Sequence, residues 1–280
     1  MRDFYATAHA AAPQDQAHGL RRMFAGTRRQ VLPLVANPHV PHCAVVLDRL
    51  AAVLAAQGRQ VLVVDAALHS PAAQELAVLD LAACVERLSP RVSYLAARGL
   101  PMTHVDTRGC AGAFIDALQQ AAPQADVVLL HAEAADLARL LMHRSARPLL
   151  IAADDPESVK HAYATCKLLT RRCGLMTYDL LLAAAPGSPR APSIAYTLGR
   201  CADGFLGALL HDWALIDPAG EPGDPPDEAL GRLLAAQLTL EDAPALRNGP
   251  AGAPGAANAA GAGAGAVGSF QPASTTHVFR

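Results

Sequence analysis

The stretch from Val35 to Ala67, VANPHVPHCAVVLDRLAAVLAAQGRQVLVVDAA, holds the residues whose types and spacing raise a chemical question. Its pattern predicts a strand, a short loop, a long helix and a second strand, which is the setting of a phosphate-binding loop. Such a loop uses glycines to aim backbone N–H groups at phosphate, a lysine for charge and Ser/Thr to hold Mg²⁺. The loop here, NPHVPHCA, contains no Gly, Lys, Ser or Thr. The sequence therefore predicts the frame of a nucleotide site without its phosphate chemistry.

Two other chemistries are open to the polar residues near these strands. His39, His42 and Cys43 could be metal ligands, but no fourth ligand is near them in the sequence, so we expect no metal site. Asp154 and Asp155 could act as an acid/base pair, although helix capping accounts for Asp155 without further assumptions. We therefore assign no catalytic residue to the chain itself.

Short apolar runs that alternate with helical patterns predict the elements that carry these residues. Buried strands separated by helices indicate crossover connections and a mostly parallel sheet with helices on both faces, where ligands bind beyond the carboxyl ends of the strands. The expected strands are Val31–Ala36, Val61–Asp65, Val92–Leu95, Val127–His131, Leu149–Ala153 and Leu180–Ala184.

Two helices are predicted with defined ends. The first runs from about Ala44 to Gln57 and stops at Gly58, because glycine readily adopts a left-handed helix end. In the second, Asp155 caps the N-terminus, Pro156 occupies the first helical position, and apolar residues follow at steps of three and four. Both helices pack an apolar face on the sheet.

Composition narrows the class of protein. The 280 residues carry a net charge of −2, which gives no overall electrostatic case for nucleic acid or an anionic membrane. The six cysteines are scattered, as in a reduced cytoplasmic chain, and the first thirty residues do not resemble a secretory signal. No uninterrupted apolar stretch of about 18 residues occurs, so we expect a cytoplasmic protein.

Four segments follow one another along the chain: DQAHGLRRMF, LAAVLAAQGRQVLVVDA, DDPESVKHAYATCKLL and CADGFLGALLHDWALIDP. Together and in this order they resemble the FlhG (FleN) family of MinD/ParA-like regulators of flagellar number and placement. DQAHGLRRMF resembles the DQAxGLR motif that opens that family, and LAAVLAAQGRQVLVVDA resembles the helix and strand after its phosphate loop. DDPESVKHAYATCKLL and CADGFLGALLHDWALIDP resemble two later family segments, so the resemblance spans about residues 15–218. It implies a MinD-like P-loop NTPase fold.

The same resemblance exposes departures at the nucleotide site. Laid on the family motif K-G-G-x-G-K-[ST], the chain reads Pro38, His39, Val40, Pro41, His42, Cys43 and Ala44. Of the family's D-x-D only Asp65 remains, and the magnesium-side Asp is replaced by His131. The adenine-recognising Asn is replaced within LLAAAP. We therefore expect neither ATP nor Mg²⁺ as cofactor, and a pseudo-ATPase rather than an enzyme.

For the N-terminal motif, the resemblance implies activation of the partner GTPase FlhF. Gln16, next to Asp15, would orient the attacking water in the partner's active site. Leu20 and Phe24 would anchor the helix in a groove, while Arg21 would pair with acidic or phosphate groups. An ordinary amphipathic helix covering a core edge is the alternative.

These observations divide the chain into four parts. Residues 1–30 form the activator segment, 31–218 the MinD-like domain, 219–245 a linker with a short helix, and 246–280 a disordered Gly/Ala/Pro tail. The short helix carries several acidic residues, which makes membrane binding doubtful. The rival interpretations are an active ATPase switch and an anti-activator of a flagellar transcription factor; basal-body components are further possible partners. A homodimer and recruitment to the cell pole or inner membrane face also remain open.

Overall fold

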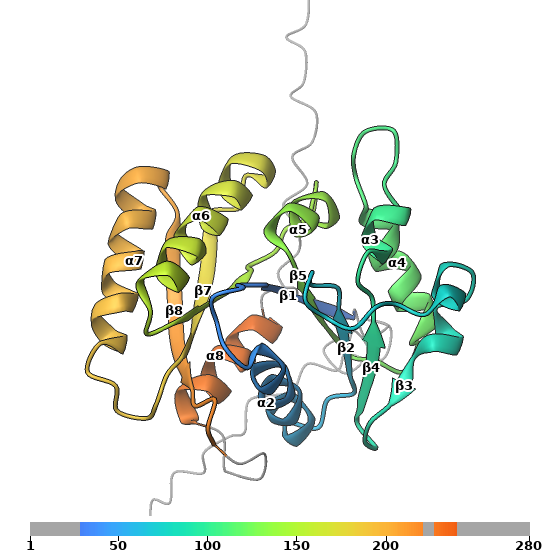
Figure 1. Ribbon diagram of the computed structural model, residues 1–280, viewed down its shortest axis with the longest axis horizontal. Coiled ribbons are helices and arrows are strands. Elements are labelled where there is room, and N and C mark those ends of the chain that lie inside the picture. The colour runs from blue at the N-terminus through green and yellow to red at the C-terminus, as the bar shows by residue number, and fades with distance from the viewer. Residues whose placement is uncertain (1–28, 221–226, 240–280) are drawn as a thin grey trace, which may run out of the picture. The chain divides into compact units, whose positions relative to one another are not determined.

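The computed structural model describes residues 29–220 and 227–239, in which eight strands form one sheet (Figure 1). The strand order is β3-β4-β2-β5-β1-β6-β7-β8, and every neighbouring pair is parallel except β3 with β4. The strands are β1 (Gln30–Val35), β2 (Val61–Asp65), β3 (Glu86–Arg87), β4 (Val92–Ala96), β5 (Val127–Ala132), β6 (Leu149–Ala153), β7 (Thr177–Ala183) and β8 (Leu209–Ile216). The predicted mostly parallel sheet is confirmed.

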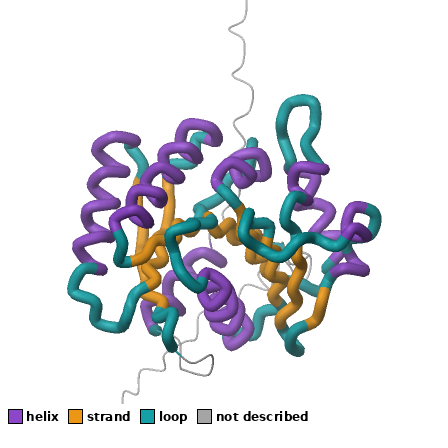
Figure 2. The backbone as a smooth tube through the Cα atoms, viewed as in Figure 1, coloured by secondary structure: helices purple, strands orange, loops and turns teal. Residues whose placement is uncertain are grey.

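Helices cover both faces of this sheet, as Figures 1 and 2 show. On one face, α2 (Cys43–Ala56) and α8 (Glu228–Thr239) pack on an apolar cluster that includes Leu34 and Leu129. A second cluster, which includes Phe114 and Leu130, lies under the helices of the other face. Those helices are α3 (Leu100–Thr103), α4 (Gly112–Ala121), α5 (Ala134–Leu140), α6 (Pro156–Cys173) and α7 (Ala191–Leu206), and two short 3₁₀ turns, η1 (Glu75–Val78) and η2 (Ala82–Cys84), precede β3.

The predicted strands agree with the observed ones to within a few residues, but the sequence missed two. β7 begins at Thr177 rather than Leu180, because its polar first residues still pair with neighbouring strands. β8 was not predicted, since His211 and Asp212 interrupt its apolar run; as an edge strand it is buried only in part. β3 is a two-residue edge strand with no periodicity to detect.

Both helices with predicted ends are confirmed. α2 ends just before Gly58, which has φ 85°, in the left-handed region that favours glycine. At the start of α6, the Asp155 carboxylate accepts a hydrogen bond from the amide of Ser158 at 3.0 Å, and Pro156 is the first helical residue. Asp155 therefore caps the helix, which is the role that the sequence analysis preferred over acid/base catalysis.

The short helix expected after the linker is α8, and it packs on the sheet beside β8. Its four leucines, Leu230, Leu233, Leu234 and Leu238, are buried. Because this apolar face is covered by the protein, it does not present itself to lipid. No helix in residues 29–220 or 227–239 is long and apolar enough to cross a membrane. Residues 1–28 of the activator segment and the whole low-complexity tail lie outside the described residues.

Candidate functional site

The loop between β1 and α2 is fixed by Asn37, a buried polar residue that the sequence analysis did not single out. Its side-chain nitrogen donates to the carbonyl of Ile151 at 2.8 Å and to the carbonyl of Ser158 at 3.0 Å. Its side-chain oxygen accepts the amide N–H of His39 at 3.1 Å. Asn37 thus ties the loop to β6 and to the first turn of α6.

The loop leaves few backbone donors for a phosphate. Pro38 and Pro41 have no N–H. The N–H of His39 is bonded to the Asn37 side chain, and that of Val40 to the Asn37 carbonyl at 3.1 Å. Residues 38–41 therefore present no free N–H group. Val40 is itself only 5% exposed and belongs to the apolar cluster under α2, so the loop folds inward onto the core.

His42 adopts φ 56° and ψ 38° immediately before α2 begins at Cys43. This left-handed conformation is uncommon for a residue other than glycine. In the motif that the sequence resembles, a glycine stands at this position. The backbone path that glycine usually serves is therefore retained, while the imidazole at this point is exposed.

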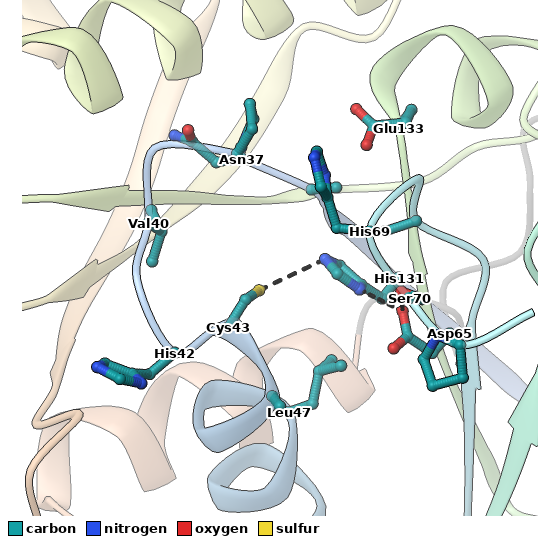
Figure 3. Close-up of a pocket in the computed structure, with 15 residues that line it drawn as sticks. Asn37, Val40, His42, Cys43, Leu47, Asp65, His69, Ser70, His131 and Glu133 are labelled. Atoms are coloured by element: carbon teal, nitrogen blue, oxygen red, sulfur yellow. Dashed lines mark hydrogen bonds and ion pairs between the residues drawn. The ribbon is translucent and has the colours of Figure 1, made fainter.

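A cavity of about 330 Å³ lies beyond the carboxyl ends of the central strands, next to this loop (Figure 3). It is lined by the loop, the start of α2, the segment after β2 and the end of β5. This is the edge at which parallel α/β sheets bind ligands. All six residues that the sequence analysis placed at the altered nucleotide site line this cavity: Pro38, His42, Cys43, Ala44, Asp65 and His131.

A chain of polar contacts runs along one wall of the cavity, where Figure 3 shows it. The Nδ1 atom of His131 lies 2.7 Å from Oδ1 of Asp65, and its Nε2 atom lies 3.5 Å from Sγ of Cys43. The Ser70 hydroxyl donates to the same carboxylate oxygen. His131 and Asp65 are only 4% and 7% exposed, so this pair is screened from water.

Electrostatics make the buried pair ionic. Burial lowers the pKa of His131, but its hydrogen bonds with Asp65 and Cys43 outweigh burial and raise the pKa to about 9. Burial alone would raise the pKa of Asp65, yet the hydrogen bonds from His131 and Ser70 hold it below its ordinary value. Burial and the Asp65 charge raise the pKa of Tyr94 to about 12. At neutral pH an imidazolium faces a carboxylate.

The other residues predicted to be functional do not line the cavity in the described part of the chain. His39, one of the weighed metal ligands, packs its ring against His161 of α6, with ring centroids 5.7 Å apart. In the part of the chain that the structure describes, no three His, Cys, Asp or Glu side chains are grouped as a metal site would need.

The activator residues, Asp15, Gln16, Leu20, Arg21 and Phe24, lie outside the described residues. Ser70, which the sequence analysis missed, follows a predicted strand, and only that position could have suggested it.

Comparison with solved structures decides the fold. A chain of the MinC:MinD cell division protein complex from Aquifex aeolicus superposes with a TM-score of 0.52 at 11% identity, over 74% of this chain and 96% of that one. The chain has a MinD-like P-loop NTPase fold. A plasmid partition protein from Borrelia burgdorferi has a TM-score of 0.52 at 8% identity, over 74% of this chain and 98% of that chain.

A second plasmid partition protein from Borrelia burgdorferi, bound to AMPPNP, shares the MinD-like fold with a TM-score of 0.52 at 8% identity, over 76% of this chain and 99% of that chain. At these identities the likeness establishes the fold alone. No protein-family profile matches the sequence, and no curated protein matches it.

Proposed function

We propose that this chain is a flagellar regulator that keeps the MinD-like fold, lacks nucleotide chemistry and stimulates an FlhF-like GTPase through the segment Asp15–Phe24. The observation that carries the proposal is the motif DQAHGLR, placed directly ahead of β1 on a MinD-like domain. The order of three further matching segments along the chain supports the same family.

The geometry of the loop supports the loss of nucleotide chemistry. Phosphate binding requires converging N–H groups, a positive charge and a magnesium ligand. Residues 38–41 present no free N–H, the position of the lysine is occupied by Cys43, and that of the Ser/Thr by Ala44. The surviving carboxylate, Asp65, is committed to His131 and Ser70. The lysine and the Ser/Thr of an ATP–Mg²⁺ site are therefore replaced, residues 38–41 offer no free N–H, and the surviving carboxylate is occupied.

The activating role needs no nucleotide in this chain. A glutamine supplied in trans can orient the water that attacks GTP, and a short amphipathic helix can dock by its apolar side. In the segment, Gln16 would supply the amide, whereas Leu20, Arg21 and Phe24 would dock it. The domain would then display the helix and supply further contact surface.

The first test is GTP hydrolysis by the FlhF protein of the same organism. We expect the full-length chain to accelerate hydrolysis without added ATP, by roughly ten-fold or more, because a positioned water is the chief requirement of the reaction. Gln16→Ala should abolish the acceleration while leaving binding intact. Gln14→Ala, a change of the same kind two residues earlier, is the matched control and should behave as wild type.

The outcomes separate the alternatives. Equal stimulation by wild type and Gln16→Ala would refute the role of the glutamine. Failure of wild type to stimulate or bind FlhF would refute the proposal and direct attention to a flagellar transcriptional activator or basal-body component. Acceleration that requires ATP would favour a nucleotide-switched protein instead.

A second test addresses ATP directly. Titration calorimetry with ATP and Mg²⁺ should show no saturable binding at micromolar concentrations, because residues 38–41 present no free N–H and Cys43 and Ala44 replace the lysine and the magnesium ligand. Oligomeric state measured by light scattering should be the same with and without ATP. Magnesium-dependent binding with a micromolar Kd would show that the chain is an ATPase-type switch.

A further inference from the structure

Cys43, His131 and Asp65 stand in a row along the wall of the cavity, although they come from three different elements. Sγ of Cys43 lies 3.5 Å from Nε2 of His131, and Nδ1 of the same ring lies 2.7 Å from Oδ1 of Asp65. A thiol, an imidazole and a carboxylate in this order are the arrangement that nucleophilic acyl transfer uses. The three side chains are close enough to react without rearrangement.

The imidazole is held in a defined orientation. Because Asp65 accepts from Nδ1, the opposite ring atom, Nε2, is the one presented to the sulfur. Ser70 donates to the same carboxylate oxygen and fixes the carboxylate in turn. Both His131 and Asp65 are buried, so neither side chain is free to swing into solvent. The ring can therefore deliver a proton to one place only, next to Sγ.

The position of Cys43 suits a nucleophile. It is the first residue of α2, where backbone N–H groups have no acceptor within the helix and the helix dipole favours negative charge. Such groups stabilise both a thiolate and the oxyanion of an acyl intermediate. The sulfur is half-buried on the cavity wall, which leaves it accessible to a small molecule.

The other five cysteines differ from Cys43. None of them lines the cavity, so no second thiol is placed to form a disulfide with it. Cys84 and Cys166 are buried, and burial raises the pKa of the Cys166 and Cys173 thiols. Cys201 is half-buried like Cys43 but begins no helix, which makes it a useful internal comparison.

We infer that Cys43 is a nucleophile that accepts an acyl group from a small activated ester or thioester bound in this cavity. The Cys43 thiolate attacks the carbonyl carbon, forming a C–S bond and an oxyanion near the start of α2. The bond to the leaving group then breaks, and the leaving group takes the proton from Nε2 of His131. The products are an acyl-cysteine, a neutral imidazole and the protonated leaving group. No oxidant or cofactor is needed, and the step is independent of GTPase activation.

The test uses the full-length protein and p-nitrophenyl acetate at pH 7. We expect one acetyl group on Cys43, mapped by mass spectrometry, with release of one equivalent of p-nitrophenol. Its rate should exceed that of Cys201 in the same chain by about 10²-fold, in keeping with the effect of a positioned acid/base. Cys43→Ala should abolish the fast release, and Cys201→Ser should leave it unchanged.

His131→Gln, with folding checked by circular dichroism, should slow acetylation of Cys43 by a similar factor. Acetylation of Cys43 no faster than that of Cys201 in the wild-type chain would overturn the inference, and this comparison needs no variant. Fast acetylation that persists in His131→Gln would overturn the role of the imidazole. Release of p-nitrophenol that maps only to residues outside the cavity, with no acetyl group on Cys43, would also overturn the inference.

Discussion

Replacing Asp179 by alanine should lower the free energy of unfolding by about 3–5 kcal/mol, because it removes one partner of a buried ion pair. The Asp179 side chain is fully buried on β7, and its Oδ2 lies 2.9 Å from Nε of Arg147, whose side chain is 6% exposed. The same oxygen accepts from Nε2 of Gln237 on α8 at 2.7 Å. The variant would leave the Arg147 charge buried without its carboxylate.

Burial raises the pKa of Asp179, although Arg147 and Gln237 oppose the shift, so the pair carries a large desolvation cost. For that reason the double variant Arg147→Met with Asp179→Ala should be more stable than Asp179→Ala alone. Urea denaturation at pH 7 measures the free energy of unfolding of both variants. The matched control is Asp116→Ala, since Asp116 pairs with Arg144 in solvent at 2.7 Å and should cost less than about 1 kcal/mol. A loss below that value for Asp179→Ala would contradict the prediction.

The stability that His131 contributes should disappear as the pH rises. The pKa of His131 is raised from 6.5 to about 9 in the folded chain, so protonation stabilises the fold. This contribution is complete below pH 6.5 and is lost as the pH rises to about 9. The shift corresponds to a loss on the order of 3 kcal/mol across that window. Asp65 retains the complementary charge there, because its pKa is lowered.

Denaturation of wild type and His131→Gln between pH 6 and 9.5 tests this. The difference in the free energy of unfolding between the two proteins should shrink as the pH rises. Wild type loses the proton of His131 over this range, whereas the variant has no imidazole to lose one. His69→Gln is a suitable control: His69 lines the same cavity but is exposed, and its removal should leave the wild-type pH profile unchanged. A constant difference between wild type and His131→Gln would show that the pKa of His131 is not raised in the folded chain.

The two predictions concern different parts of the fold, with different consequences for function. The Asp179 network joins α8 to β7, so losing it should loosen the helix that covers one face of the sheet. The His131 network lies at the carboxyl edge of the sheet, beside the loop that follows β1. Variants at Asp179 should therefore affect stability and leave the reactivity of Cys43 unchanged in the folded protein.

Local signals in the amino-acid sequence predicted most of the helices and strands and many residues of the site. Apolar runs predicted six of the eight described strands, and the glycine after α2 and the aspartate before α6 marked helix ends, because these signals are local. The resemblance to the FlhG family assigned Asp65 and His131 to the same altered nucleotide site as the loop, and both line the cavity beside it. The replaced phosphate-loop residues were also visible in the sequence alone.

The contacts among those residues depend on the folded chain and could not be predicted from local sequence. His131 is 66 residues from Asp65 and 88 from Cys43, and no local pattern reports that the three side chains meet. The anchoring of the loop by Asn37 depends on a carbonyl 114 residues away, and the link from Asp179 to Gln237 spans 58 residues. The sequence analysis missed β8 because the strand is only partly buried and its apolar residues are interrupted. Its place at the edge of the sheet, which explains this partial burial, is known only from the strand order. Local periodicity encodes which face of an element is buried, whereas the partners of a buried polar group are fixed when the sheet brings distant segments together.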